Sequence, residues 1–558
     1  MTARRVLPRF WIEEPMPCSR TLPASGWAAL YGVRVFEVAN FQKLAFLKKC
    51  NQFTNLLIFF FILCNNKQRK ERRAMIRLTS LTLKNFKNIK DGSIALSSWN
   101  VKKSSFPGPD IIGIYGQNGS GKTSVIQALA ILKDVFLGNS ISRSAADCVS
   151  RKSGDEKTED ARISVKGVIF DEPSQDPVQE FSYTVAFAEQ GPHIAKTDSG
   201  PVIMSEEIAV KRFGDKMSKH TLMAYVGGAD WDYEIRPKMV WKSVFANEKI
   251  RTELAVEQRL AFKNHSSLVF SYDFLTMLLK IYRKDDGVHS NRARKELDSI
   301  GQLCELILSI QKFAIFDFAI VDTTRYAISI MNHLKMSTHE GEYGNFADNS
   351  FDVNLLEPDN LTSDQLGVLN NTLERMNPVL TALVPGLSLS LYRFGQSLGD
   401  DGKPVERVQI TCARDGVALP LRCESEGIKK LVSILMLLID VYAKPGACVA
   451  VDELDSGIFE FLLGELLQVL KEHGRGQLIF TAHNLRPLEI LDKGSLYFTT
   501  TNPDNRYIKF RGSRKKNNLR DQYLRAINLG GQPETVYEST NPFDIDGAFY
   551  DAGFPEED

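Results

Sequence analysis

From residue 75 onward, apolar and polar residues follow patterns that predict β-strands. The stretch IRLTSLTLKNFKNI (76–89) alternates apolar and polar positions, and IIGIY (111–115) is a short, mostly apolar run. Between 161 and 213, the stretches ARISVKGVIF, EFSYTVAFAE and EEIAVKRF alternate in the same way and are joined by turn-rich segments such as DEPSQDP. We therefore expect a β-rich region over 75–235.

The pattern then changes to helical spacing. SLVFSYDFLTMLLKIY (267–282) and IGQLCELILSIQKFAIFDFAI (300–320) indicate a helical region over 236–350. Strand-like CVAV (448–451) and GQLIFTAHN (476–484) alternate with the helical stretches IKKLVSILMLLIDVY and DSGIFEFLLGELLQVL. No sustained heptad repeat appears, which excludes long coiled-coil arms.

The two ends of the chain lack this order. LLIFFFILC (56–64) is about half the length that crosses a bilayer, and the basic KQRKERRA follows it, whereas a signal peptide has its basic segment first. Because KQRKERRA can be encoded by purine-rich codons, as a ribosome-binding site would be, we hypothesise that the working protein begins at Met75 and that 1–74 is a non-native or disordered extension. An interfacial or partner-binding tail is the alternative. The acidic tail 541–558 is interpreted as a flexible terminus or partner hook.

Composition narrows the class of protein. The 558 residues are 43% hydrophobic, and 69 basic residues nearly cancel 68 acidic ones. Net charge therefore predicts no strong attraction to nucleic acid or membrane. The eight cysteines form no CxxC pair, which argues against a zinc or disulfide framework and favours a cytoplasmic protein.

A glycine-rich loop carries the strongest chemical signal. Residues 116–123 read GQNGSGKT and match G-x-x-x-x-G-K-[ST] between a predicted strand and a predicted helix. Its backbone N–H groups would surround phosphate oxygens, Lys122 would reach the β- and γ-phosphates, and the Thr123 hydroxyl would hold Mg²⁺. The alternative is a glycine-rich turn with an incidental lysine. The expected nucleotide-binding residues of the loop are Gly116, Asn118, Gly119, Gly121, Lys122, Thr123 and Ser124.

An acidic pair late in the chain supplies the expected partner of this loop. Asp452 and Glu453 directly follow the apolar run CVAV, so we expect them at the end of a strand beside that of the phosphate loop. Asp452 would support Mg²⁺, and Glu453 would act as general base on the attacking water. A helix N-cap is the alternative for this pair. His483 ends the next strand, within reach of a γ-phosphate, although a lone histidine is also a common structural residue.

The stretch RCESEGIKKL (422–431) places Ser425 and Gly427 at the start of an apolar helix, where a hydroxyl and backbone N–H groups can bind an anion. Because the chain already has its own phosphate loop, the nucleotide of a second subunit is the expected ligand. An ordinary N-cap is the alternative. About 300 residues separate Lys122 from Ser425, so we expect an insertion within the domain that carries both motifs.

The order of these motifs resembles that of ABC-type ATPases. The resemblance implies an α/β P-loop head with a mixed sheet, ATP and Mg²⁺ as cofactors, and a homo-oligomer with ATP between subunits. It also implies that Asp455 lies at the dimer seam and that His483 senses the γ-phosphate. The sequence departs from the family pattern in two ways. Glu424 replaces the leucine that usually precedes the Ser-x-Gly signature, which is Ser425 to Gly427 here, and the glutamine of the family's Q-loop is not evident. We expect the halves of the head over 75–235 and 351–540, with the insertion β-rich and then helical.

Within that group, the chain is similar to the ATPase heads of OLD-type proteins and other AAA ATPases of abortive-infection loci, through LTLKNFKNI (81–89) and NLRDQYLRAINLGGQPE (518–534). Full-length OLD proteins carry a Toprim nuclease with a DxD pair, but only about 75 residues follow His483 here. We interpret Asp544 and Asp546 as an accidental match. The resemblance therefore implies a stand-alone ATPase that controls a separate nuclease or toxin, as in the anti-phage pairs Septu and PARIS.

Two other functions remain open. A DNA-repair ATPase of the RecF kind would clamp nucleic acid, and RYIKFRGSRKKNNLR (506–520) offers basic residues with Tyr507 and Phe510 for stacking. A solvated surface segment is the alternative for this stretch. A transporter ATPase fits poorly, because of the large insertion and because no membrane partner segment is present.

Overall fold

The computed structural model describes residues 74–99, 108–149, 159–171, 174–188, 201–213, 220–226, 234–238, 240–241, 247–283, 291–322, 333–337, 350–399, 402–414, 416–510 and 518–554. They belong to one compact unit, Arg69–Glu340 with Asn349–Asp558. The hypothesised extension lies outside the described residues except for Ala74, so the start at Met75 stays a prediction.

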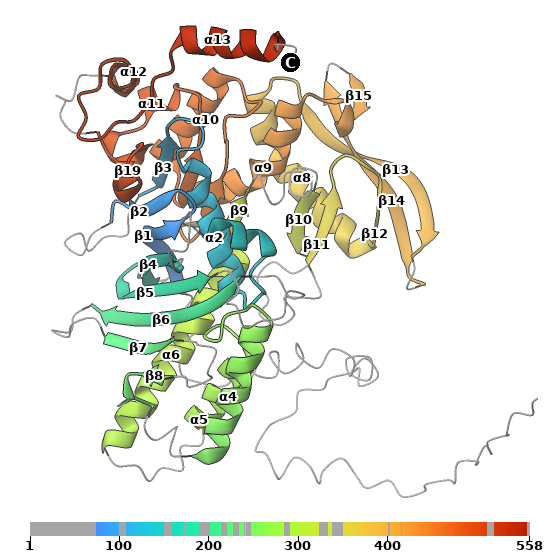
Figure 1. Cartoon of the computed structure of the whole chain (residues 1–558). Coiled ribbons are helices and arrows are strands. Elements are labelled where there is room, and N and C mark those ends of the chain that lie inside the picture. The colour runs from blue at the N-terminus through green and yellow to red at the C-terminus, as the bar shows by residue number, and fades with distance from the viewer. Residues whose placement is uncertain are drawn as a thin grey trace, which may run out of the picture. The chain divides into compact units, whose positions relative to one another are not determined.

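A six-stranded sheet forms the centre of the head, in the order β19-β18-β3-β17-β16-β9. Figure 1 labels its strands β3, β9 and β19. Five strands run parallel, and β19 pairs antiparallel with β18. Strands β16 and β17 are buried along their whole length, as strands in a covered parallel sheet should be. The predicted α/β head with a mixed sheet is confirmed. The strands are β3 (Asp110–Tyr115), β9 (Phe318–Val321), β16 (Cys448–Val451), β17 (Gln477–Thr481), β18 (Leu496–Thr499) and β19 (Tyr507–Ile508).

Helices cover this sheet. Helix α2 (Lys122–Phe136) contacts β16 and β17, and α10 (Glu460–His473) contacts β3. Helix α9 (Glu426–Ala443) packs on β16 and contributes apolar side chains both to the core around the sheet and to a second core. The short α11 (Pro487–Ile490) contacts both α10 and α12 (Leu519–Leu529). The helical prediction from 455 is wrong over its first five residues, because a turn occupies them before α10.

A seven-stranded antiparallel sheet has the order β2-β1-β4-β5-β6-β7-β8. Its strands β1 and β2 precede the glycine-rich loop, so this sheet is not a simple insertion after it. The five later strands include the three alternating stretches predicted from the sequence. The strands are β1 (Ala74–Phe86), β2 (Ile89–Ala95), β4 (Ala161–Asp171), β5 (Pro177–Ala188), β6 (Val202–Arg212), β7 (His220–Val226) and β8 (Glu234–Arg236).

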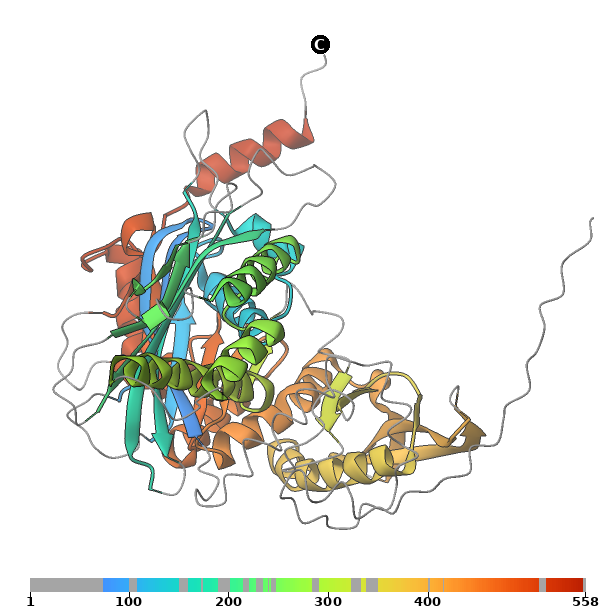
Figure 2. The ribbon, with the colours of Figure 1, turned by 90° about the horizontal axis from the view of Figure 1, so that it is seen from below.

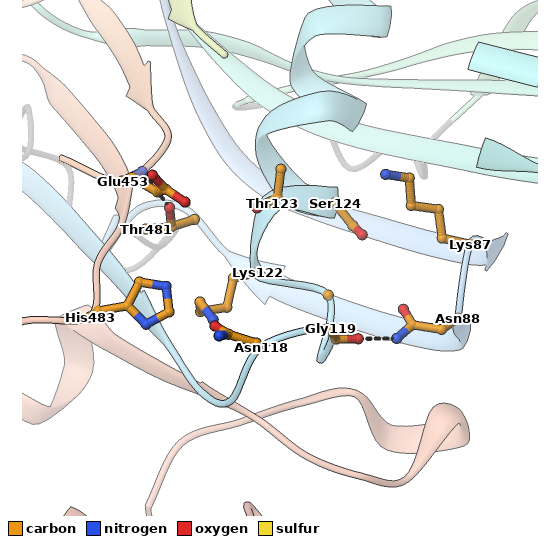
Figure 3. Close-up of a pocket in the computed structure, with 11 residues that line it drawn as sticks. Lys87, Asn88, Asn118, Gly119, Lys122, Thr123, Ser124, Glu453, Thr481 and His483 are labelled. Atoms are coloured by element: carbon orange, nitrogen blue, oxygen red, sulfur yellow. Dashed lines mark hydrogen bonds between the residues drawn. The ribbon is translucent and has the colours of Figure 1, made fainter. Parts of the chain in front are cut away.

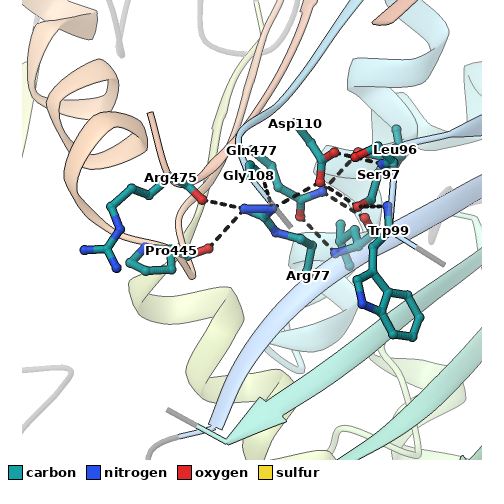
Figure 4. Close-up of polar contacts among 11 residues, drawn as sticks. Arg77, Leu96, Ser97, Trp99, Gly108, Asp110, Pro445, Arg475 and Gln477 are labelled. Atoms are coloured by element: carbon teal, nitrogen blue, oxygen red, sulfur yellow. Dashed lines mark hydrogen bonds and ion pairs between the residues drawn. The ribbon is translucent and has the colours of Figure 1, made fainter. Parts of the chain in front are cut away.

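A buried polar network joins the two sheets at the starts of the core strands (Figure 4). Arg77 of β1 donates to the carboxylate of Asp110, the first residue of β3, at 3.2 Å and to the carbonyl of Arg475. The side chain of Gln477, the first residue of β17, both accepts from and donates to the backbone of Leu78. Burial lowers the pKa of Arg77. This network holds β1 against β3 and β17 at the ends opposite the glycine-rich loop.

The helices α4 (Glu248–Lys263), α5 (Tyr272–Arg283) and α6 (Asn291–Phe316) follow the antiparallel sheet. Figure 2 shows them beside that sheet, and α6 contacts β1 and β7. The predicted helix over 300–320 is wrong at its end: β9 begins at Phe318 and pairs with β16, so the predicted insertion 236–350 contains a strand of the core sheet. The strand forms because Phe318–Val321 is a short apolar run that β16 can pair with.

One segment of α6, Glu296–Phe316, is long and apolar enough to cross a membrane. Half of it is buried inside the protein, where α6 contacts α2, α5 and β9. These contacts make it a core helix of the described unit.

Residues 333–420 build a separate small core with α9. The pair β10 (His333–Ser337) and β11 (Ser350–Asn354) forms one sheet of this core. A second sheet consists of β12 (Asp359–Leu361), β14 (Pro404–Arg414), β13 (Ser388–Leu398) and β15 (Val417–Pro420). Helix α8 (Ser363–Leu383) packs on β13, and Leu431, Val432 and Leu435 of α9 complete this core. The sequence did not separate this part from the rest of 351–540.

The acidic tail contains a helix, α13 (Pro542–Gly553). Asn541 caps it by accepting from the Phe543 N–H, with proline at the first helical position, where its missing N–H costs nothing. These residues are therefore helical, and their interpretation as a flexible terminus or partner hook stays a prediction. Asp544 and Asp546 are exposed on this helix.

Candidate functional site

The loop between β3 and α2 has the backbone that its glycines permit. Gly116, Gly119 and Gly121 have positive φ values of 152°, 75° and 96°. At Gly116 a Cβ would lie only 1.6 Å from Oγ1 of Thr499, so no side chain fits there. The loop ends at the N-terminus of α2, where backbone N–H groups and the helix dipole favour an anion. These glycines are required by the loop, which argues against an incidental turn.

Lys122, the first residue of α2, is held by the glycine-rich loop. Lys122 is 7% exposed and donates through Nζ to the carbonyls of Gly116 at 2.8 Å and Gln117 at 3.0 Å. Burial lowers the pKa of Lys122, while Asp452 and the nearby acids raise it. Because loop carbonyls hold the ammonium group, it lies within the loop that would receive phosphates.

The acidic pair lies at the end of β16, as predicted, and Asp452 is 1% exposed. The Thr481 hydroxyl donates to its carboxylate and accepts a 2.7 Å bond from the Glu453 N–H. Glu453 is exposed and has a φ of 49°. The N-cap alternative is wrong, because α10 starts at Glu460 with Phe459 as its cap.

The strand order differs from the prediction. Strand β17 lies between β3 and β16, so the acidic pair is not on the strand next to the glycine-rich loop. Strand β17 follows β16 in the sequence but lies between β3 and β16 in the sheet, an order that local sequence does not reveal. The three strands still end at one edge of the sheet, where ligands bind in open α/β sheets.

A cavity of about 350 Å³ opens at this edge. Figure 3 shows His483 and Glu453 on one side and the glycine-rich loop on the other. His483 lies two residues beyond β17, not at its end as predicted. The Asp455 carboxylate accepts from the backbone N–H groups of His483 at 2.8 Å and Asn484 at 2.6 Å, which fixes the turn that carries the histidine. The cavity is lined by Lys87, Asn88, Asn118, Gly119, Gly121, Lys122, Thr123, Ser124, Glu453, Thr481 and His483.

Thr123 and Asp452 can share a divalent cation. The Thr123 hydroxyl oxygen lies 3.3 Å from an oxygen of Asp452. Two ligands at right angles on an octahedral Mg²⁺ are about 3 Å apart, since each lies about 2.1 Å from the ion. Among the described residues no three His, Cys, Asp or Glu side chains form a metal cluster. A Mg²⁺ that takes its other ligands from phosphates and water fits this pair.

The Ser-Glu-Gly step begins α9, as predicted. Ser425 is exposed and caps the helix by accepting from the Ile428 N–H at 3.3 Å. Of the described residues that line the cavity, none comes from this step. Gly427 contacts Gly457 so closely that a Cβ on Gly427 would lie 1.9 Å from the Gly457 carbonyl oxygen. The N-cap alternative is thus correct for the single chain, and it leaves the serine facing solvent.

The turn between β1 and β2 contributes residues that the sequence analysis missed. Lys87 and Asn88 line the cavity, and Asn88 donates to the Gly119 carbonyl. Asn85 and Lys87 adopt positive φ values of 49° and 53°, which aim this turn at the glycine-rich loop. The NFKN sequence between two alternating stretches was the available signal, because asparagine tolerates this backbone conformation.

The basic stretch at 506–520 contains both buried and exposed residues among those that the structure describes. Arg506, Tyr507 and Phe510 are 5%, 6% and 7% exposed. Arg506 donates to the Asn88 carbonyl, Tyr507 donates to the Gly121 carbonyl at 2.8 Å, and Phe510 stacks on Phe498. These three residues are buried, so they offer no stacking surface for nucleic acid, and they support the cavity instead. Lys509, Asn518 and Arg520 are exposed, as the solvated-surface alternative predicts. Residues 511–517 of the stretch lie outside the described residues.

Replacing Lys87 with alanine is expected to raise the Kd for ATP about tenfold, because it removes a cation from the wall of the cavity beside the glycine-rich loop. Titration with a fluorescent ATP analogue measures this change. The matched control is Lys84→Ala, since Lys84 is an exposed residue of β1 paired with Asp91. An unchanged Kd for Lys87→Ala would place the nucleotide away from the β1–β2 turn.

Comparison with known proteins finds a family that matches most of the chain. Residues 76–486 match the AAA ATPase domain family. The chain belongs to this family. As a member of the AAA ATPase domain family it is an ATPase, and the glycine-rich loop and acidic pair both lie within the matched residues. No curated protein matches the chain.

Solved structures similar to this AAA ATPase include heads of other ATPases. The Smc head bound to the C-winged helix domain of ScpA is 14% identical, covers 79% of this chain and 98% of that chain, and has a TM-score of 0.37. The SMC head domain from Thermotoga maritima is 14% identical, with 78% and 100% covered and a TM-score of 0.30. The recombination mediator RecF with ATP is 11% identical, with 74% and 94% covered and a TM-score of 0.27. At these TM-scores the similarities do not define a shared function.

Proposed function

We propose that two copies of this ATPase close on ATP, each completing the other's site, and that this assembly controls a separate effector. The observation that carries the proposal is the position of Ser425. It begins an 18-residue helix, is exposed, and is not among the described residues that line its own chain's cavity. A helix N-terminus with a free approach suits the phosphates of a nucleotide held by another subunit.

The residues around the cavity divide the hydrolytic work. Lys122 and the backbone N–H groups of the glycine-rich loop bind the phosphates, with Thr123 and Asp452 holding Mg²⁺. Bound Mg²⁺ would neutralise charge on the β- and γ-phosphates. Glu453 accepts a proton as water attacks the γ-phosphorus, the bond to the bridging oxygen breaks, and ADP and phosphate leave. His483 faces the same cavity. From there it would contact the γ-phosphate.

Residues from the partner complete each site. Ser425 and Gly427 of one copy contact the γ-phosphate held by the other. Asp455 lies near the seam between them, where its carboxylate holds the turn that carries His483. Hydrolysis then removes the γ-phosphate that both copies contact, so ATP acts as a timed link between them.

The effector is a nuclease or toxin on another chain, and the biological role is bacterial defence against phages from within the cytoplasm. The support for this role is the resemblance to the OLD-like, abortive-infection group. The exposed helix α13 is consistent with a partner hook, since it carries three aspartates and bulky apolar side chains in solvent.

Bacteria that carry this gene with its neighbouring genes are expected to restrict phages, measured as a fall of at least about tenfold in plating efficiency on a phage panel. Lys122→Ala should abolish the protection, because phosphate binding fails. Glu472→Gln, an exposed change on α10, is the matched control and should protect like wild type. Full protection by Lys122→Ala would contradict the proposed role of ATP, and no protection by wild type would contradict the defence role.

A RecF-like clamp on nucleic acid is the alternative function. It gains no support from the aromatic residues that suggested it, because Tyr507 and Phe510 are buried. ATP-dependent, salt-sensitive DNA binding by the purified protein would favour this alternative.

A further inference from the structure

Helix α9 and the turn that carries Glu453 are locked together within one chain. The first contact is the backbone approach of Gly427 to Gly457, which leaves no room for a side chain. The second is a hydrogen bond from the Lys430 ammonium group to the backbone carbonyl of Glu453. Both contacts lie within the first five residues of α9, next to Ser425.

Lys430 is an unusual residue for its place. It is 3% exposed on a helix whose neighbouring core positions are apolar. Burial lowers the pKa of Lys430, whereas Asp455, Glu453 and Asp452 raise it. A buried ammonium group persists when it is hydrogen-bonded and faces opposite charge, and here the three carboxylates around the site supply that charge.

The backbone of Glu453 is held from both sides. Its N–H donates to Thr481, whose hydroxyl bonds Asp452, and its carbonyl accepts from Lys430. Its φ of 49° is unfavourable for a residue with a side chain, so the conformation persists only where neighbours hold it. The direction of the Glu453 carboxylate depends on that backbone.

We propose that Lys430 is a positioning residue for hydrolysis: from the helix that begins at Ser425, it holds the Glu453 backbone and so aims the carboxylate at the attacking water. This inference rests on the proposed function, in which Glu453 is the base. It also implies that the surface offered to the partner's nucleotide and the base of the chain's own site move as one block. Binding of the start of α9 to the partner's ATP would then change the rate at which the chain hydrolyses its own ATP.

The test compares Lys430→Met with Lys429→Met in the full chain. Lys429 is the adjacent residue of the same helix and is paired with Glu426, so it is a matched control. Methionine has about the length of a lysine without its charge. Because removing one partner of a buried charged group destabilises a fold, thermal unfolding of both variants is measured beside their kinetics. We expect Lys430→Met to lower kcat about 10- to 100-fold, with KM and the Kd for ATP within about threefold of wild type.

A double substitution separates positioning from structural support. If Lys430 acts through Glu453, Lys430→Met should lower the single-turnover rate no further in a Glu453→Gln background. Lys430→Gln serves as the second variant if Lys430→Met does not fold, with the same expected pattern.

A kcat for Lys430→Met equal to that of Lys429→Met, or two effects that multiply in the double variant, would overturn the inference. Failure of the proposed function would look different: wild type and Glu453→Gln would then hydrolyse ATP at the same rate.

Discussion

Replacing Glu453 with glutamine is expected to lower kcat for ATP hydrolysis by at least about 100-fold while the Kd for ATP stays within about threefold. Glutamine keeps the shape of the side chain but cannot take a proton from water. Glu453 lines the cavity together with the glycine-rich loop and His483. Hydrogen bonds from Lys430 and to Thr481 hold its backbone, and so fix the position from which its carboxylate extends. Phosphate release and nucleotide titration measure the two quantities.

Glu472→Gln is the control for this change, because Glu472 is exposed near the end of α10, where it accepts from Gln468 and pairs with His473. Its kcat should match that of wild type. A kcat for Glu453→Gln within threefold of wild type would show that another group acts as the base.

Replacing Ser425 with arginine is expected to abolish ATP-dependent assembly and to lower hydrolysis about 100-fold. The bulky cation would block the α9 N-terminus from the partner's nucleotide and remove the cap that accepts from Ile428. Binding of ATP to the single chain should be unchanged, because Ser425 is not among the described residues that line the chain's own cavity. Solution mass and nucleotide titration measure these effects.

Ser174→Arg is the matched control, since Ser174 is an exposed serine in the turn between β4 and β5. It should assemble and hydrolyse like wild type. If Ser425→Arg lost ATP binding as a single chain, Ser425 would serve its own site, and the shared-site proposal would be wrong.

The parts of the site that depend on local chemistry could be predicted from the sequence. The glycines at 116, 119 and 121 stand where positive φ values and close approaches require them, so the loop motif located the phosphate site. Asp452 and Glu453 follow a short buried strand, and that pattern also depends only on neighbouring residues.

The rest depends on contacts between distant segments. The sequence of β9 predicts the end of a helix, because its pairing with β16 cannot be seen in the local pattern. Lys87 and Asn88 line the cavity because β1 packs on the core sheet. The Arg77 network helps to hold β1 there, and it joins residues that are nearly 400 positions apart in the sequence. Tyr507 and its neighbours look like a nucleic-acid surface because burial cannot be read from a basic, aromatic stretch.

The central claim is that ATP joins two copies through the start of α9. The most direct measurement is the solution mass of Glu453→Gln at one protein concentration, with and without Mg-ATP, beside the Glu453→Gln/Ser425→Arg and Glu453→Gln/Ser174→Arg variants. The account predicts that Mg-ATP raises the mass of Glu453→Gln and of the Ser174→Arg control, and that Ser425→Arg abolishes the rise. A mass that does not respond to Mg-ATP, or one that rises equally with Ser425→Arg, would contradict it.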